Sequence, residues 1–281
     1  MIVVTGATGN VGRELVPLLA GADEEVVAVS RRPRPADLPA GVRHARADLA
    51  DAASLRPVLD GADALFVVLG GELNSRGESP GSLLDEVVAA GVKRVVLLSS
   101  QINSTRPHAP SHTRLREFED AVRACGADFT VLRPAGFASN AFAWAESVRA
   151  RRTVFAPFGE VALPVVDPAD IAEVAAAVLR EDGHAGRTYE LTGPEAISPR
   201  RQAAVIAEAL AEDIAFVELS REEAHAHLAR FMPEEVVDGT LDILGLPLPA
   251  EQTVAADVRH VLRRPARPFA AWIARNLAAF R

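Results

Sequence analysis

The sequence predicts an α/β fold, in which a doubly wound parallel sheet is joined to a smaller, mostly helical C-terminal lobe. Up to about Pro134, short apolar segments alternate with helical patterns. The apolar segments are nearly continuous, which is typical of parallel strands covered by helices on both faces. Right-handed crossovers between such strands give a doubly wound sheet.

The first half of the chain supplies this sheet and its helices. The expected strands are residues 2–4, 26–29, 42–45, 64–69, 94–99 and 129–132. The expected helices between them are residues 11–20, 52–59, 82–90 and 111–124.

After Pro134 the pattern is mixed. The expected helices are residues 139–149, 167–179 and 198–210, and the expected strands are residues 154–155, 162–165 and 188–192. The remainder reads as mostly helical. We therefore expect residues 1–134 to bind a ligand on the sheet, and residues 135–281 to form a mixed α/β substrate lobe partly interleaved with them.

The composition argues against several classes of protein. Hydrophobic residues make up 49% of the 281 positions and charged residues 24%, a soluble globular balance. No uncharged apolar run reaches about 18 residues, so we expect no membrane span and a cytoplasmic location. The net charge of −8 disfavours direct binding to nucleic acid. The single cysteine, Cys125, excludes an internal disulfide, and His225 and His227 do not share the helix face that a metal site needs.

A glycine-rich turn follows the first expected strand. Its glycines have a Gly-x-x-Gly-x-x-Gly spacing and precede a helix. Glycine lets the backbone approach a pyrophosphate, while the helix N-terminus supplies N–H donors and a partial positive charge. We predict a Rossmann dinucleotide site here, and the alternative is a structural tight turn. The predicted contacts are Gly6, Thr8, Gly9, Asn10, Val11 and Gly12.

The end of the second strand indicates which dinucleotide is bound. An NAD site commonly has Asp or Glu there to hold the ribose 2′-hydroxyl. This chain has Ser30, Arg31 and Arg32 instead. A guanidinium can pair with a 2′-phosphate, which a carboxylate would repel. We predict NADP(H) as the cofactor, although an arginine pair at a strand end can also be simply solvated.

Further cofactor contacts are expected where other strands end. Asp48 and Leu49 follow the third strand, and the alternative for Asp48 is a helix N-cap. Leu69 and Gly70 end the fourth strand, where the alternative is a loop with no ligand role. The remaining predicted contacts are Ser99, Pro134 and Gly136.

Several motifs carry a family resemblance. The first motif, at residues 5–12, is Thr-Gly-Ala-Thr-Gly-Asn-Val-Gly. Three short motifs follow it, Ser-Arg-Arg at 30–32, Asp-Leu at 48–49 and Ser-Ser at 99–100. The last three are Thr-Val-Leu-Arg-Pro at 130–134, Phe-x-x-Asn at 137–140 and Tyr-Glu-Leu-Thr-Gly-Pro at 189–194. Together they resemble the NmrA-like group of atypical short-chain dehydrogenases/reductases over nearly the whole chain. The resemblance implies a Rossmann domain with a small substrate lobe. It also implies either an NADPH-dependent reductase of quinones, dyes and aromatic compounds or a redox-responsive regulator.

The Tyr-x-x-x-Lys acid/base pair of typical short-chain dehydrogenases cannot form in this chain. Tyr189 lies in a late strand, and Lys93 lies at a turn before the fifth strand. The polar residues left near the strand ends make Ser99 and His112 the candidate catalytic residues. A serine hydroxyl can donate to a substrate oxygen, and histidine can deliver a proton near neutral pH. The alternative for His112 is an exposed histidine at a helix start.

The segments after the fifth and sixth strands supply the candidate substrate contacts, Gln101, Phe137, Asn140, Phe142 and Trp144. The aromatic residues can form an apolar wall for a flat substrate, although aromatic residues at helical spacing also fit a core. Asn140 can orient substrate or cofactor, or act as a helix N-cap.

The sequence therefore favours an NADPH-dependent reductase of a quinone-like or conjugated aromatic small molecule. Such acceptors need little acid catalysis, because solvent can protonate the product. The alternatives are an NADP(H)-sensing regulator that acts through a protein partner without turnover, and a non-redox cyclase or isomerase. A homodimer or a regulatory protein partner is compatible with each of these functions.

Overall fold

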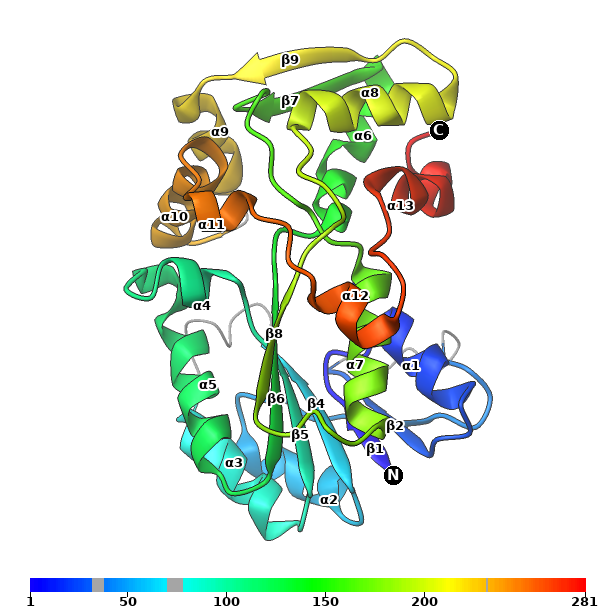
Figure 1. Ribbon diagram of the computed structural model, residues 1–281, viewed down its shortest axis with the longest axis vertical. Helices are drawn as coiled ribbons and strands as arrows, with labels where there is room; N and C mark the ends of the chain where they lie inside the picture. Colours follow the sequence, from blue (N-terminus) through cyan, green and yellow to red (C-terminus); the bar gives the residue numbers. More distant parts are fainter. Residues whose placement is uncertain (32–37, 70–77, 231) are drawn as a thin grey trace.

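A seven-stranded parallel sheet forms one half of the molecule (Figure 1). The computed structural model describes residues 1–31, 38–69, 78–230 and 232–281. The strand order is β3-β2-β1-β4-β5-β6-β8. The strands are β1 (Ile2–Val4), β2 (Val26–Val29), β3 (Arg43–Ala45), β4 (Ala64–Val68), β5 (Arg94–Leu98), β6 (Asp128–Pro134) and β8 (Arg187–Leu191). The predicted doubly wound sheet is confirmed, and the strand order reverses between β1 and β4, where ligands bind in such sheets.

Helices cover both faces of this sheet. One face carries α1 (Gly12–Ala20), α7 (Pro168–Arg180) and α12 (Asp257–Leu262), and the other carries η2 (Ala52–Leu55), α2 (Arg56–Leu59), α3 (Pro80–Ala89) and α5 (Thr113–Ala124). Side chains alternate along β1, so Val4 packs with Leu15 in one core while Val3 packs with Phe118 in the other. Burial on both faces explains why the strands read as continuous apolar runs.

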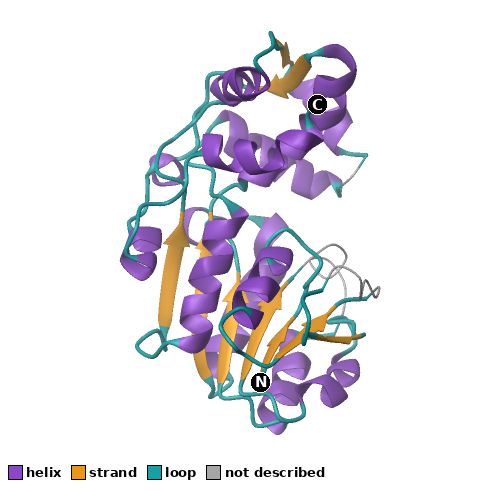
Figure 2. Ribbon diagram, turned by 90° about the vertical axis from the view of Figure 1, so that its right-hand side faces the viewer, coloured by secondary structure: helices purple, strands orange, loops and turns teal. Residues whose placement is uncertain are grey.

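The second lobe lies beyond the carboxyl ends of the strands (Figures 1 and 2). It contains η5 (Ala138–Trp144), α6 (Ala145–Arg151), β7 (Thr153–Pro157), α8 (Pro199–Leu210), β9 (Ala215–Leu219), α9 (Arg221–Leu228), α10 (Glu234–Gly245), α11 (Pro249–Gln252), α13 (Phe269–Asn276) and η6 (Leu277–Ala279). Its main core gathers around Trp272 and Phe280. A separate small cluster joins α9 to α10 through Ala224, Val237 and Leu241. Two short elements, α4 (Ile102–Thr105) and η4 (Pro110–His112), follow β5 and face this lobe.

One expectation about the second lobe is wrong, and one strand in it was not expected. The strand expected at residues 162–165 is only an isolated bridge between Leu163 and Ile197, because Pro164 has no N–H to donate to a ladder. The segment after residue 210 is mostly helical, as expected, and it also contains β9, which pairs in parallel with β7. Every residue of β9 is exposed or half-buried, although its sequence, Ala-Phe-Val-Glu-Leu, is largely apolar.

The chain after residue 134 returns to the first sheet. Asp167 caps α7 by accepting from the Ala169 N–H at 2.9 Å, and β8 then adds to β6. The fully buried Asp170 on α7 accepts from Arg264, at 2.7 Å, and from Arg267. These ion pairs fix the C-terminal segment against the sheet. Within the described ranges, none of the helices has the length and apolar character needed to cross a bilayer.

Candidate functional site

The turn between β1 and α1 is shaped by the absence of side chains. Gly6 has φ +60°, and a Cβ on it would lie 2.3 Å from Val68 Cγ1. A Cβ on Gly12 would lie 2.2 Å from the Gly6 oxygen and 2.7 Å from Ala7 Cα. Thr8, Gly9 and Asn10 are exposed on the outside of the turn, whereas Val11 is buried beneath it. The close backbone approach in this turn, next to the partial positive charge of the α1 N-terminus, therefore fits a pyrophosphate.

The end of β2 places its polar residues beside this turn. The Ala7 N–H donates to the Val29 oxygen at 3.2 Å, which joins the turn to the end of β2. The Ser30 hydroxyl is buried and lies 2.9 Å from His44 Nε2 on β3. Arg31 is exposed, and Arg32 lies outside the described residues. His44 was not among the predicted site residues, because it belongs to a different strand from its partner Ser30.

The third and fourth strands end close to the same turn. Asp48 is exposed, and its carboxylate accepts from the Ala50 N–H at 3.0 Å. It does not act as the helix cap, since η2 begins after Asp51. Leu49 packs against the core, and Leu69 is buried. Gly70 lies outside the described residues.

The end of β5 carries a buried polar network. The Ser99 hydroxyl donates to Glu119 Oε1 and accepts from Asn103 Nδ2 at 3.0 Å. Asn103 Nδ2 also donates to Glu119 Oε1 at 2.9 Å. Ser99 is 7% exposed and Glu119 3%. The hydroxyl hydrogen of Ser99 is thus held by Glu119, so in this arrangement it is not directed at a substrate oxygen.

Arginines complete this network. Arg133 on β6 donates to Glu119 through Nε at 3.0 Å and through a terminal nitrogen at 2.7 Å, and Arg123 donates at 2.9 Å. Burial alone would raise the pKa of Glu119, but the hydrogen bonds from Arg133, Ser99, Asn103 and Arg123 lower it to about 2. Glu119 is therefore a permanent carboxylate near neutral pH.

A second carboxyl group contacts the same arginine. Arg133 lies 3.5 Å from Glu190 Oε1, which also accepts from the Ser104 hydroxyl at 2.9 Å. Burial raises the pKa of Glu190 despite these contacts. Glu119, Arg133 and Glu190 were not among the residues predicted for the site. Arg133 lies in the motif at residues 130–134 and Glu190 in the motif at residues 189–194. Their presence in these motifs is the sequence feature that could have identified them as site residues.

The other candidate acid, His112, lies at the end of η4. It is half-buried, and its Nδ1 lies 2.9 Å from the Ser111 hydroxyl. Burial, and then the nearby Arg116, lowers the pKa of His112. Its ring is therefore largely neutral near pH 7.

The Tyr-x-x-x-Lys pair is absent from the carboxyl edge of the sheet. Lys93 precedes β5 and pairs with Asp63 at 2.9 Å. The Tyr189 hydroxyl lies 2.8 Å from Nδ1 of His184, which precedes β8. Both groups interact at the amino-terminal ends of the strands, opposite the carboxyl ends that carry the predicted site.

The segment after β6 passes beside the ends of β5 and β8. Pro134 is buried, and its oxygen accepts from the Gln101 N–H at 3.0 Å. The Gln101 side chain is buried and its Nε2 lies 3.4 Å from the Ala250 oxygen. Gly136 is exposed and its oxygen accepts from the Val166 N–H at 2.8 Å. Asn140 is exposed within η5, whose N-cap is Phe137, so Asn140 is not the cap.

The residues of the predicted aromatic wall are partly buried and pack against two core clusters. The Phe142 ring packs edge-on against Trp272 at 4.8 Å and stacks on Phe280 at 6.2 Å. Trp144 packs against the same cluster, and Phe137 packs against the core beneath α7. These contacts fit a core role, but all three aromatic residues are only partly buried, so their place in a substrate wall stays a prediction.

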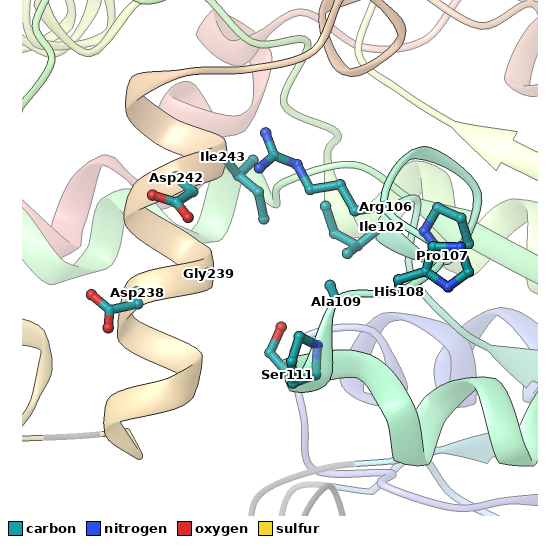
Figure 3. A pocket seen from close by; sticks show the side chains of 11 residues that line it. Ile102, Arg106, Pro107, His108, Ala109, Ser111, Asp238, Gly239, Asp242 and Ile243 are labelled. Atoms are coloured by element: carbon teal, nitrogen blue, oxygen red, sulfur yellow. The ribbon is translucent and has the colours of Figure 1, made fainter.

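A cavity of about 620 Å³ lies between α10 and the segment that follows β5 (Figure 3). One wall comes from residues 102–111, and the other from residues 238–243. Gly239 allows the walls to meet, because a Cβ there would lie 3.1 Å from Ser111 Oγ. A ligand-sized cavity near the carboxyl ends of the strands is where this class of sheet binds substrates.

Together these features place two kinds of site along one edge of the sheet. The β1 end has a turn that fits a dinucleotide phosphate, and the β5 end has a ligand-sized cavity beside a fixed polar network. The residues at this edge could therefore hold a dinucleotide and a small molecule next to each other. Among the described residues, no cluster of histidine, cysteine and carboxylate side chains is arranged to hold a metal ion.

Comparison with known proteins assigns a family. Residues 6–182 match the model of the NAD(P)H-binding family. The chain is 36% identical over its full length to a (4-alkanoyl-5-oxo-2,5-dihydrofuran-3-yl)methyl phosphate reductase of Streptomyces griseus, of which it covers 99%. It is 32% identical to an NAD(P)H azoreductase of Xenophilus azovorans, again over its full length and 99% of the relative.

A solved structure supports the fold. The NADPH-dependent quinone oxidoreductase of Escherichia coli, in complex with NADPH, superposes with a TM-score of 0.82 at 24% identity, over 99% of this chain and 100% of that one. The prediction of a nicotinamide dinucleotide is confirmed as NAD(P)H, and the predicted resemblance to NADPH-dependent reductases agrees with these relatives. The chain belongs to the NAD(P)H-binding family, among relatives that are oxidoreductases.

Proposed function

We propose that this protein is a reductase that transfers hydride from NADPH to a conjugated, quinone-like or aromatic small molecule. The observation that carries the proposal is the juxtaposition, along one edge of one sheet, of a phosphate-binding turn and a ligand-sized cavity. The Streptomyces relative is named for a dihydrofuranone and the Xenophilus relative for azo compounds. Both names describe electron-poor unsaturated systems, which accept hydride readily.

The bound nicotinamide would supply the hydride, and the protein would supply binding and orientation. The turn at Gly6 and Gly12 would hold the pyrophosphate against the start of α1. Ser99 would act as a positioning residue, because Glu119 and Asn103 fix it at the end of β5. Solvent would protonate the product, because a conjugated acceptor spreads the charge that hydride brings.

The end of β2 supports a preference for NADPH over NADH. Arg31 is exposed beside the phosphate turn, where a guanidinium can pair with the 2′-phosphate. A charge-assisted hydrogen bond contributes about 1.5–3 kcal/mol, so Arg31→Ala should weaken NADPH binding about 10- to 100-fold and leave NADH binding unchanged. Fluorescence titration of both cofactors measures this. Equal dissociation constants for the two in the wild-type protein would contradict the preference.

The reductase itself is tested by following NADPH absorbance with a panel of quinones, azo dyes and unsaturated lactones. We expect acceptor-dependent oxidation with at least one class. The sequestered Ser99 hydroxyl supports a second candidate, an NADP(H) sensor that regulates a partner protein. Tight NADPH binding with no oxidation across the panel would favour the sensor. Conversion of a substrate without a change in NADPH would instead favour the non-redox cyclase or isomerase.

A further inference from the structure

The cavity beside the end of β5 offers the acceptor a binding surface that the sequence did not indicate. We propose that the cavity between α10 and residues 102–111 is the acceptor pocket, and that Ile102, Ala109 and Ile243 determine the size of the planar ring system it takes. This inference rests on the proposed reductase function and extends it to particular residues.

The cavity adjoins the end of β5. Ile102 stands three residues after Ser99 and is only 8% exposed, so it forms the floor nearest the sheet. Figure 3 shows the side chains of Ile102, Ala109 and Ile243 directed toward one space from three different elements. The volume of about 620 Å³ falls within the range of small-molecule sites, about 300–1,000 Å³. Apolar side chains that converge in this way favour a flat, uncharged ring.

Small residues stand on both sides of the cavity. Gly239 on α10 has no side chain, and Ala109 opposite contributes only a methyl group. The Ser111 side chain lies close to Gly239, because a Cβ on Gly239 would stand 3.1 Å from Ser111 Oγ. The absence of a side chain at Gly239 therefore lets α10 approach η4 closely, which leaves a narrow space that suits a planar ligand.

Arg106 holds the two walls at a fixed distance. It leaves the end of α4 and lies along the cavity wall toward α10 (Figure 3). Its Nε lies 2.7 Å from Glu251 Oε1, and its terminal nitrogen lies 2.9 Å from Glu251 Oε2 and 2.9 Å from the Leu246 oxygen. Burial would raise the pKa of Glu251, but the hydrogen bond from Arg106 and those from Leu248 N–H and Thr105 lower it. This ion pair joins the β5 side of the site to the second lobe, so Arg106 is a positioning residue for the pocket.

The acidic residues of α10 contribute less to the pocket. Asp242 pairs with Arg221 on α9 at 2.7 Å, and Asp238 lies 3.6 Å from His225. In Figure 3 both carboxylates lie on the side of α10 away from Ile102 and Ala109. The space between the walls is therefore lined mainly by apolar groups.

Two substitutions of opposite sense test the assignment. Ala109→Phe would fill the opening, so kcat/KM for 2-methyl-1,4-naphthoquinone should fall at least about tenfold, since overpacking a filled site is costly. The fall for 1,4-benzoquinone, which has one ring fewer, should be several-fold smaller. Ile243→Ala would enlarge the cavity and should shift the preference toward the naphthoquinone. The dissociation constant of NADPH should stay unchanged in both variants.

A matched control makes the same chemical change elsewhere in the lobe. Ala226 is exposed on α9 and does not line the cavity, so Ala226→Phe should keep the wild-type ratio of the two quinones. Arg106→Lys keeps the charge but loses the paired geometry. It should raise KM for both quinones more than it lowers kcat, which a general loss of folded protein would not do.

Direct binding separates failure of the pocket from failure of the reductase. Calorimetric titration of the naphthoquinone into the NADP⁺ complex should give an affinity at least several-fold weaker in Ala109→Phe than in wild type. Wild-type quinone ratios and affinities in both Ala109→Phe and Ile243→Ala would overturn the assignment, even if NADPH is oxidised normally. Absence of NADPH oxidation in the wild type would instead overturn the proposed function, and the titration would still decide the pocket.

Discussion

The two ends of the carboxyl edge of this sheet are built in opposite ways. At β1 the site is defined by missing side chains, since Cβ atoms on Gly6 or Gly12 would collide with neighbouring atoms. At β5 the site is defined by side chains that come from distant segments, with Glu119 from α5 and Arg133 from β6 meeting at Ser99. The first end is encoded within a few consecutive residues, and the second only by the folded chain.

This difference has a functional consequence. The pyrophosphate of a dinucleotide is the same in every member of a family, so a backbone turn is sufficient to bind it. The acceptor varies, and a cavity bounded by α10 can change with single side chains while the network behind it keeps β5 and β6 in place. The comparison therefore predicts different effects of substitution at the two ends.

The largest effect on stability is expected at the β5 end. Glu119→Gln would leave Arg133 and Arg123 without their buried partner charge, and breaking a buried pair costs about 3–5 kcal/mol. Urea unfolding at pH 7 measures this loss. Glu117→Gln on the same helix is the control, because Glu117 is half-exposed and its pair with Arg114 is 3.6 Å long. Equal stability of the two variants would show that the network contributes nothing special.

The same network predicts a pH dependence. The folded-state pKa of Glu119 is lowered to about 2, so its contribution to stability is fully present above the unfolded pKa of about 4.3. That contribution should disappear as pH falls from the unfolded value toward 2. In Glu119→Gln the free energy of unfolding should depend less steeply on pH in this window. Parallel curves for wild type and variant would contradict the assignment.

The largest effect on cofactor binding is expected at the β1 end. Gly12→Ala adds one methyl group against backbone atoms of Gly6 and Ala7, and such overpacking costs about 1–3 kcal/mol. NADPH binding should weaken about 10- to 100-fold by the same energy scale. Gly81→Ala is the control, because the nearest atom to its added Cβ is Ser79 Oγ at 3.7 Å. Fluorescence titration should give wild-type affinity for that variant.

A smaller effect is expected for Phe142, and it tests whether this residue belongs to the core or to the substrate site. Phe142→Leu should destabilise the fold by about 1–2 kcal/mol, because the ring loses its contacts with Trp272 and Phe280. The KM for the acceptor should be unchanged within about twofold. A large rise in KM without a change in thermal stability would return Phe142 to the substrate site.

The smallest effect is expected for His112. Its Nδ1 lies against Ser111, and burial lowers its pKa. His112→Ala should therefore change kcat by less than about threefold, well below the 10²- to 10⁴-fold contribution of a general acid. A loss of that larger size would identify His112 as the proton donor.

More of the fold than of the candidate site could be predicted from the sequence. Continuous apolar strands and the glycine spacing indicate the sheet and its cofactor, because both depend on local sequence. Only the strand expected at residues 162–165 was wrong, because the hydrophobic pattern does not take account of the missing N–H of Pro164. Strand β9 was missed, because it depends on pairing with β7, which is distant in the sequence.

The candidate site shows the same limit. Ser99 was selected for its place at a strand end, but its role depends on Glu119, 20 residues away. For Phe142 the sequence left a substrate wall and a core position both open, and its contacts with Trp272 and Phe280 come from a segment more than 120 residues later. The cavity depends on contact between α10 and η4, which are more than 100 residues apart in the chain, and no local motif encodes that contact.

Single-turnover hydride transfer would show whether this protein reduces an acceptor with NADPH. NADPH carrying deuterium at nicotinamide C4 would be mixed with the protein and an unsaturated lactone, whose reduced carbon retains the label. The account predicts one equivalent of deuterated product for each NADPH oxidised when the transferred position carries the label, and slower oxidation than with unlabelled NADPH. Tight NADPH binding without acceptor-dependent oxidation and without label in the reduced lactone would contradict it.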